Sequence, residues 1–260
     1  MFNMLGILLL VLLVPLAAEC SSIRILKLSD GVPFQMGKVD SRRIVHPGMG
    51  AKKLTLNYSV SQPGHEFPQH VHDNSDDTFL VLQGQVDVRQ GDSRKPLLTG
   101  QAAFVPSGQI HGTVTTGTGT AILISFQSPP DSVLYSGARN SSLPGAAAPK
   151  GVITPGAVKI LEFGNRNGFF VHPGMGSRRV AVAHRKLRPG EKFSTAVSGS
   201  GEQFLFVWKG SISVTSAGKH YQARERETVW ISDSTLDVRN DFPGETVVIQ
   251  VQAPPGSQWK

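Results

Sequence analysis

The feature that most constrains the fold of this 260-residue chain is an internal repeat. The segment Val-His-Pro-Gly-Met-Gly at 45–50 recurs at 171–176, an offset of 126 residues, and the same offset aligns Gly84 with Gly210. The alignment continues to residue 128 without a gap. Because a repeat of this length can bury a core of its own, the sequence predicts two copies of one domain.

Each copy contains short segments with the composition of β-strands. Turn residues separate them, and no segment after residue 20 keeps an apolar period of 3.6 residues. In the first copy the expected strands are 54–60, 78–82, 86–88, 102–105 and 120–126. Regularly spaced short strands with Gly-rich turns predict an all-β fold, either a sandwich or a barrel.

The ends of the domains follow from changes in composition. Residues 1–20 hold an apolar run at 5–16 followed by small residues, which is typical of a cleaved signal peptide and too short to span a bilayer comfortably. We therefore expect an exported protein, either secreted, periplasmic or retained in the secretory pathway, with an uncleaved membrane anchor as the alternative. Domains are expected at 23–127 and 158–254, with a Pro- and Gly-rich linker at 128–157.

The charged residues point to no nucleic-acid partner. The net charge of +7 is spread over pairs such as Arg42-Arg43, and no run of five basic residues occurs. Cys20 is the single cysteine, so a chain cleaved after it has no disulfide. The fold must therefore rest on its apolar cores.

Only the first copy contains a series of three histidines, one carboxylate and several turn residues. His70 and His72 alternate along one expected strand, so both point to the same face with Cα atoms roughly 6.5–7 Å apart. Asp77 begins the next strand, and His111 arrives from a different strand after a Pro-x-Gly turn. Three imidazoles and a carboxylate suit one divalent ion of Mn, Fe, Ni, Zn or Cu. The full series is Gly64, His70, His72, Asp77, Gly84, Gly100, Pro106, Gly108 and His111.

The spacing of this series resembles the two-part signature of the cupin superfamily. The resemblance implies two tandem cupin barrels, also called double-stranded β-helix or jelly-roll barrels, after a signal peptide. It also implies one divalent transition metal, with Mn or Fe favoured, held by His70, His72, Asp77 and His111. Two positions depart from the signature: Asp77 replaces the usual Glu, and Thr115 stands where Asn is common. The shorter Asp77 leaves open whether it binds directly, through water, or not at all.

The second copy has lost this series. At the same offset the ligand positions become Ala196, Ser198, Gln203 and Asp237, so we expect a metal-free barrel that packs against the first. A metal-free pocket lined by Gln203 and Asp237 is the alternative. Because both copies keep His-Pro-Gly-Met-Gly, that segment is expected to be a structural turn or an interface between the barrels.

Alternation along the strands predicts a pocket beside the metal. Counting from the ligands places Phe79, Val81 and Thr113 on its walls, and no arginine falls on the inward positions counted in this way. Such a pocket suits a small organic molecule. The first hypothesis is a metal-dependent enzyme, an oxygenase or a decarboxylase. The alternative is a non-enzymatic binding or storage protein with a vestigial or structural metal. Catalytic residues stay unassigned, and both a monomer and a homo-oligomer remain open.

Overall fold

A computed structural model of the chain describes residues 22–131 and 151–256. These residues form β-strands and three short 3-10 turns: η1 Leu28–Asp30, η2 Pro47–Met49 and η3 Pro173–Met175. The all-β expectation is therefore confirmed. No helix in these two ranges is long and apolar enough to cross a membrane. The predicted signal peptide and most of the predicted linker lie outside the described residues.

The first unit is a barrel made of two sheets. One sheet has the order β5-β10-β7-β8 and the other has the order β12-β9-β6-β11-β4-β3-β2, with the pairs antiparallel. Most of its strands come from residues 32–128. These strands are β2 Val32–Met36, β3 Val39–Val45, β4 Leu56–Ser61, β5 Glu66–His70, β6 Asp76–Gln83, β7 Gln85–Gln90, β8 Ser93–Leu98, β9 Gln101–Val105, β10 His111–Thr115 and β11 Ala121–Ser128.

The second unit is a barrel in which one sheet wraps around, in the order β13-β14-β19-β15-β18-β16-β17. Its wrapping depends on two long strands, β15 and β18, which take part in both layers. Its strands are β13 Gly168–Val171, β14 Ala181–Leu187, β15 Lys192–Lys209, β16 Ser211–Ser216, β17 Lys219–Arg224, β18 Thr228–Arg239 and β19 Thr246–Ala253.

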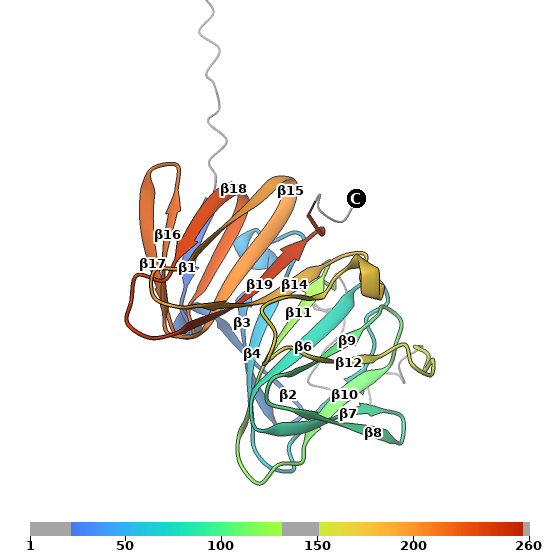
Figure 1. Ribbon diagram of the computed structural model, residues 1–260. Coiled ribbons are helices and arrows are strands. Elements are labelled where there is room, and N and C mark those ends of the chain that lie inside the picture. Colours follow the sequence, from blue (N-terminus) through green and yellow to red (C-terminus); the bar gives the residue numbers. More distant parts are fainter. Residues whose placement is uncertain (1–21, 132–150, 257–260) are drawn as a thin grey trace, which may run out of the picture.

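The two barrels exchange their first strands. β1 (Ser22–Leu26) pairs with β18 of the second unit, and β12 (Lys159–Glu162) pairs with β9 of the first unit. Figure 1 shows blue β1 beside the orange strands β16 to β18, far from the green strands that follow it in sequence. The sequence-based domains 23–127 and 158–254 place each of these strands in the other unit. Each barrel therefore needs a strand that the sequence assigned to its neighbour.

A shared apolar core joins the units. On the first-barrel strands, alternate residues such as Leu80, Phe104 and Phe126 face this shared core, whereas Phe79 and Val81 face the interior of their own barrel. The Phe126 and Phe204 rings, one from each unit, meet with centroids 5.7 Å apart. The interior of the second barrel is a separate apolar cluster that includes Leu205, Ile212 and Leu236. The molecule is thus held by three cores.

The repeated His-Pro-Gly-Met-Gly segments form the 3-10 turns η2 and η3. Met49 and Met175 pack against the shared core between the barrels. The carbonyl oxygen of Met49 accepts a hydrogen bond from Arg24 of β1 (3.1 Å), and that of Met175 accepts one from Lys159 of β12 (2.5 Å). The repeated turn therefore holds both exchanged strands by equivalent contacts.

The barrels differ in the continuity of two strands. The second barrel keeps β15 and β18 unbroken through 192–209 and 228–239. The first barrel breaks the corresponding strands at 71–75, between β5 and β6, and at 106–110, between β9 and β10. Three of the four candidate ligands border or follow these breaks within two residues, so the breaks bring the ligand side chains together.

Candidate metal centre

The candidate ligands come from three strands and one connecting loop. His70 ends β5, His111 begins β10, and these two residues are paired across the strands. His72 lies in the loop after β5, and Asp77 is the second residue of β6. Gly112 permits the close approach of β10 to β5, because a Cβ at this position would lie 2.8 Å from the Phe67 carbonyl oxygen.

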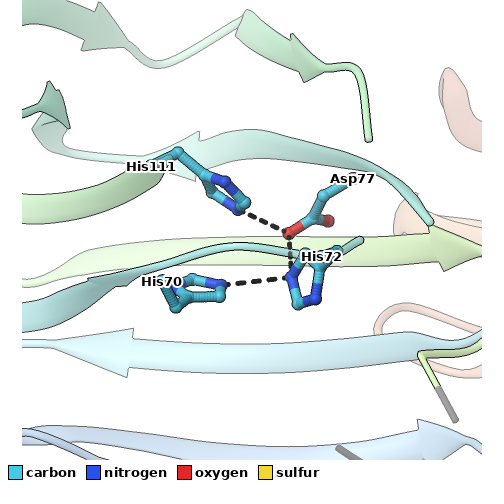
Figure 2. Close-up of side chains that lie close together, drawn as sticks. All are labelled: His70, His72, Asp77 and His111. Atoms are coloured by element: carbon cyan, nitrogen blue, oxygen red, sulfur yellow. Dashed lines mark hydrogen bonds and ion pairs between the residues drawn. The ribbon is translucent and has the colours of Figure 1, made fainter. Parts of the chain in front are cut away.

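The four side chains converge on one point (Figure 2), and their ligand atoms all lie within 4.8 Å of one another. His111 Nε2 lies 3.2 Å from Asp77 Oδ2, and His72 Nε2 lies 3.5 Å from the same oxygen. His70 Nε2 lies 3.1 Å from His72 Nε2. His72, Asp77 and His111 are buried, with His70 partly exposed at the edge of the group.

The outward-facing nitrogens of the three imidazoles have acceptors. Nδ1 of His70 lies 2.9 Å from the Pro68 carbonyl oxygen, and Nδ1 of His111 lies 3.0 Å from that of Gln109. Nδ1 of His72 lies 2.8 Å from the buried Asp131 carboxylate. A proton on each Nδ1 satisfies these acceptors and leaves an Nε2 lone pair pointing inward, the arrangement usual for metal-binding histidines.

These residues fit a divalent cation. The Nε2 atoms of His70 and His72 both point into the group, 3.1 Å apart, and in the metal-free protein the Nε2 proton of His72 lies among these atoms. In addition, Asp77 Oδ1 is buried without a hydrogen-bond partner. A cation that replaces this proton would bind the inward-facing nitrogens and give the Asp77 oxygen a partner.

Without a metal, the pKa values of the candidate ligands are shifted in different directions. Burial alone would lower the pKa of His72, but its hydrogen bonds with Asp131 and Asp77 outweigh burial and raise the pKa to about 9. Burial disfavours the Asp77 carboxylate, yet its hydrogen bonds with His111 and His72 lower its pKa. Burial, followed by electrostatic interaction with the neighbouring His111 and His72 rings, holds the pKa of His70 well below its usual range.

The metal-free protein should lose stability between about pH 6.5 and pH 9. The folded state raises the pKa of His72 above the unfolded value, so the stabilisation is fully present below about pH 6.5 and is lost as the pH rises through about 9. The expected loss in the free energy of unfolding is about 3 kcal/mol. Urea titrations of chelator-treated protein test this, with His72→Gln as the control that should flatten the decline. Stability that rises over this range would contradict the prediction.

A small cavity of about 70 Å³ opens beside the four side chains. Phe79 and Thr113 line it, as the alternation placed them. Val81 does not line the cavity: it lies on the same face as Phe79 but packs into the closed end of the barrel, in the cluster that includes Val86 and Leu97. Alternation predicts on which face of a strand a side chain lies, but it does not predict how far the cavity extends along that strand.

Three further residues near the centre were missed by the sequence analysis. Arg43 of β3 lines the cavity, and its guanidinium lies 4.4 Å from the centre of the Phe34 ring. Gln127 of β11 also lines the cavity, and its amide nitrogen lies 3.1 Å from His72 Nε2. Asp131 follows the last strand of the barrel. Inward positions were counted only from the four ligands, so side chains from β3 and β11 were not considered.

Replacing Asp131 by alanine should weaken metal binding by about 10- to 100-fold, because the carboxylate orients His72 and increases its basicity. Competition with a chelating dye measures the affinity. Asp92→Ala, at an exposed position in the turn after β7, is the control and should bind metal as the unmodified protein does. Equal affinity in the Asp131 and Asp92 variants would mean that the carboxylate does not act through His72.

The strand pairing corrects the sequence alignment of the second barrel. Thr195 pairs with Leu236 where His70 pairs with His111. The first barrel has one extra residue between 67 and 70 and another between 105 and 111, relative to segments 193–195 and 231–236 of the second barrel. Ala196 and Asp237, which the constant offset aligned with His70 and His111, are exposed instead. Gln203 does correspond to Asp77, since each pairs with a glutamine of the last strand.

Comparisons with known proteins agree with this fold. Residues 57–126 match the family described as "Cupin domain". The pirin YhhW of Escherichia coli, solved in complex with nickel(II), is 15% identical with a TM-score of 0.66, covering 90% of this chain and 100% of that chain. AerE of Microcystis aeruginosa is 15% identical with a TM-score of 0.63, covering 88% and 98%.

The oxalate decarboxylase of Bacillus subtilis, described with Mn(II) centres, is 12% identical with a TM-score of 0.67, covering 87% of this chain and 76% of that chain. No curated protein sequence matches the chain. Likeness at these identities establishes the fold alone. Residues 57–126 are therefore similar to a cupin domain, and the described residues form two tandem barrels of the cupin fold with a group of side chains that can hold a divalent metal.

Proposed function

We propose that this chain is an exported two-barrel cupin that holds one divalent transition metal, in its first barrel only, and acts as a metal-dependent enzyme on a small organic substrate. The observation that carries the proposal is the convergence of His70, His72, His111 and Asp77 beside a cavity. Three imidazoles and one carboxylate suit Mn or Fe, with Ni, Zn or Cu as the other candidates. Similar folds were solved with nickel(II) and with Mn(II) centres.

Export is supported by the sequence of residues 1–20. The first strand begins at Ser22, directly after the expected cleavage position, and pairs with β18. Cleavage would thus remove the leader and leave the paired strand intact. Fractionation of the native host followed by N-terminal sequencing of the protein tests this part of the proposal.

The reaction class that fits is oxygenation or decarboxylation. A bound Mn or Fe ion would supply Lewis acidity or oxygen activation at this position. Phe79 and Leu123 provide an apolar wall that excludes water from the ligand side chains, whereas Asn57, Ser59 and Ser125 line another part of the cavity with polar atoms. The cavity of about 70 Å³ favours a substrate of few atoms.

Arg43 favours a substrate with an acidic group. Arg43 lines the cavity that the four candidate ligands also line, and its guanidinium makes a cation–π contact with Phe34, another lining residue. A guanidinium binds a carboxylate through two parallel hydrogen bonds, which would fix one end of the substrate while its other end faces the metal group. The side chain would therefore orient the substrate.

Metal analysis and turnover assays test the proposed function together. The purified protein, loaded with Mn or Fe, should consume oxygen or release carbon dioxide with members of a panel of small carboxylic acids. Arg43→Gln should raise KM for the active acid about tenfold or more, by loss of charge-assisted hydrogen bonds. Arg42→Gln is the matched control, because Arg42 neighbours Arg43 but is exposed. A protein that binds one metal and turns over no acid would favour the binding or storage alternative.

A further inference from the structure

The second barrel places an arginine where the first barrel has part of its cavity. Arg185 of β14 corresponds to Ser59 of β4, because Val182 pairs with Val171 as Leu56 pairs with Val45. Ser59 lines the cavity beside the candidate metal ligands. The barrel without the histidine series therefore carries a guanidinium near the position that the candidate centre occupies in its partner.

The Arg185 side chain is fixed by three contacts. Its guanidinium lies 5.1 Å from the centre of the Phe169 ring and 5.3 Å from that of Phe193. Its Nε donates to Gln250 Oε1 at 2.9 Å, and this is its only side-chain hydrogen bond within 22–131 and 151–256. The two terminal nitrogens thus keep their donors available.

No carboxylate of the described chain neutralises Arg185. The side chain is partly buried, and burial is the sole cause that lowers its pKa, with no contribution from an acidic neighbour in the described ranges. Removing a charge from water is costly unless the charge is paired, and part of the Arg185 side chain is buried. An arginine held by two rings without a counter-ion indicates a place for an anion.

The polar residues behind Arg185 also have a surplus of donors. Gln250 Nε2 donates to Thr195 Oγ1 (2.9 Å) and to Gln203 Oε1 (3.1 Å), and Thr195 Oγ1 donates to the same Gln203 oxygen (2.8 Å). Gln203 Nε2 is fully buried and has no hydrogen-bond partner. Every side-chain oxygen of these three residues is therefore already engaged, and the unused groups are donors.

We propose that the second barrel is a binding site for a small carboxylate anion, held by Arg185 between Phe169 and Phe193. The planar guanidinium offers two parallel donors to a carboxylate, and Gln250 fixes its orientation through Nε. The rings shield the ion pair from water and provide apolar contact for a short carbon chain. The site requires no metal and is independent of the reaction proposed for the first barrel.

Calorimetric titration of the chelator-treated full chain with acetate tests the proposal. Sodium chloride of equal ionic strength is the blank, and Arg43→Gln serves as the background so that the first barrel does not contribute. Saturable binding is expected, and Arg185→Gln should weaken it by about tenfold or more. Lys186→Gln is the matched control: it removes the same charge from the next residue of β14, which alternation directs to the other face, and should leave binding unchanged.

Arg185→Lys keeps the test decisive if Arg185→Gln fails to fold. Lysine retains the charge but lacks the two parallel donors, so acetate binding should again fall while the fold is kept. Inorganic phosphate is titrated separately. Binding of phosphate without acetate, an equal loss of acetate binding in the Lys186 variant, or no saturable heat with acetate would each overturn the carboxylate site.

Discussion

Replacing His70 and His111 together by alanine should reduce the metal content of the purified protein from about one ion per chain to none. The double variant removes two of the four converging ligands and leaves His72 and Asp77, which are too few to compete with water and buffer for a divalent ion. Elemental analysis after reconstitution with Mn or Fe measures the result. The barrel should stay folded, because its apolar clusters do not include these histidines.

A buried histidine of the second barrel provides the matched control. His184 is 1% exposed, its Nδ1 is hydrogen-bonded to the Arg166 carbonyl oxygen, and it belongs to no ligand group among the described residues. His184→Ala should therefore keep a full complement of metal. Metal retained in the double variant would remove the basis of the candidate centre. Loss of the near-ultraviolet circular dichroism signal along with the metal would instead make the ion structural.

The repeat and the spacing of the histidine series predicted much of this molecule. A constant offset of 126 residues indicated two copies, and period-2 patterns indicated strands, which together gave the all-β fold that the structure confirms. The spacing of His70 and His72 predicted two imidazoles on one face of a strand, but His72 lies in the loop after β5. The structure nevertheless brings the two imidazoles together, in one group with Asp77 and His111. That these four bind a metal stays a prediction.

The exchange of the first strands could not be read from the sequence. Residues 22–26 and 159–162 have similar apolar patterns, and neither pattern identifies the strand that it pairs with. The barrel with which each first strand pairs depends on the path of the chain in the folded molecule and on the contacts of Arg24 and Lys159 with the repeated turns. A period-2 pattern gives the face of a strand, but not its partner.

The second barrel was misaligned for a related reason. The second barrel has one residue fewer before Thr195 and one fewer before Leu236, which reverses which side chains face inward on both strands. Thr195 and Leu236 therefore replace the expected Ala196 and Asp237. A shift of one residue moves every side chain of a strand to the other face. In the second barrel β15 and β18 are continuous strands. In the first barrel the corresponding strands are interrupted, and the candidate ligands lie in or beside these interruptions. The first copy thus has the candidate site and interrupted strands, whereas the second copy has continuous strands and lacks the histidine series.

Glu202→Gln should lower the free energy of unfolding by about 3 kcal/mol, and the melting temperature by about 10 °C. The Glu202 carboxylate comes from β15 of the second barrel and is 4% exposed. It accepts backbone N–H bonds from Lys52 (2.5 Å), Lys53 (3.0 Å) and Leu54 (3.2 Å) of the first barrel. A glutamine amide offers one oxygen in place of two and directs an NH₂ group at backbone donors, so N–H groups lose their acceptor, the buried one of Leu54 or the partly buried ones of the two lysines.

Thermal and urea unfolding measure this effect, and Glu225→Gln is the control, since its side chain is 54% exposed in the same barrel and should change stability little. Equal stability of the two variants would mean that the carboxylate does not hold the barrels together. Because each barrel also depends on a strand from the other, weakening this contact should still give one cooperative transition. Two separate transitions would instead show that the shared core and the exchanged strands do not couple the folding of the two units.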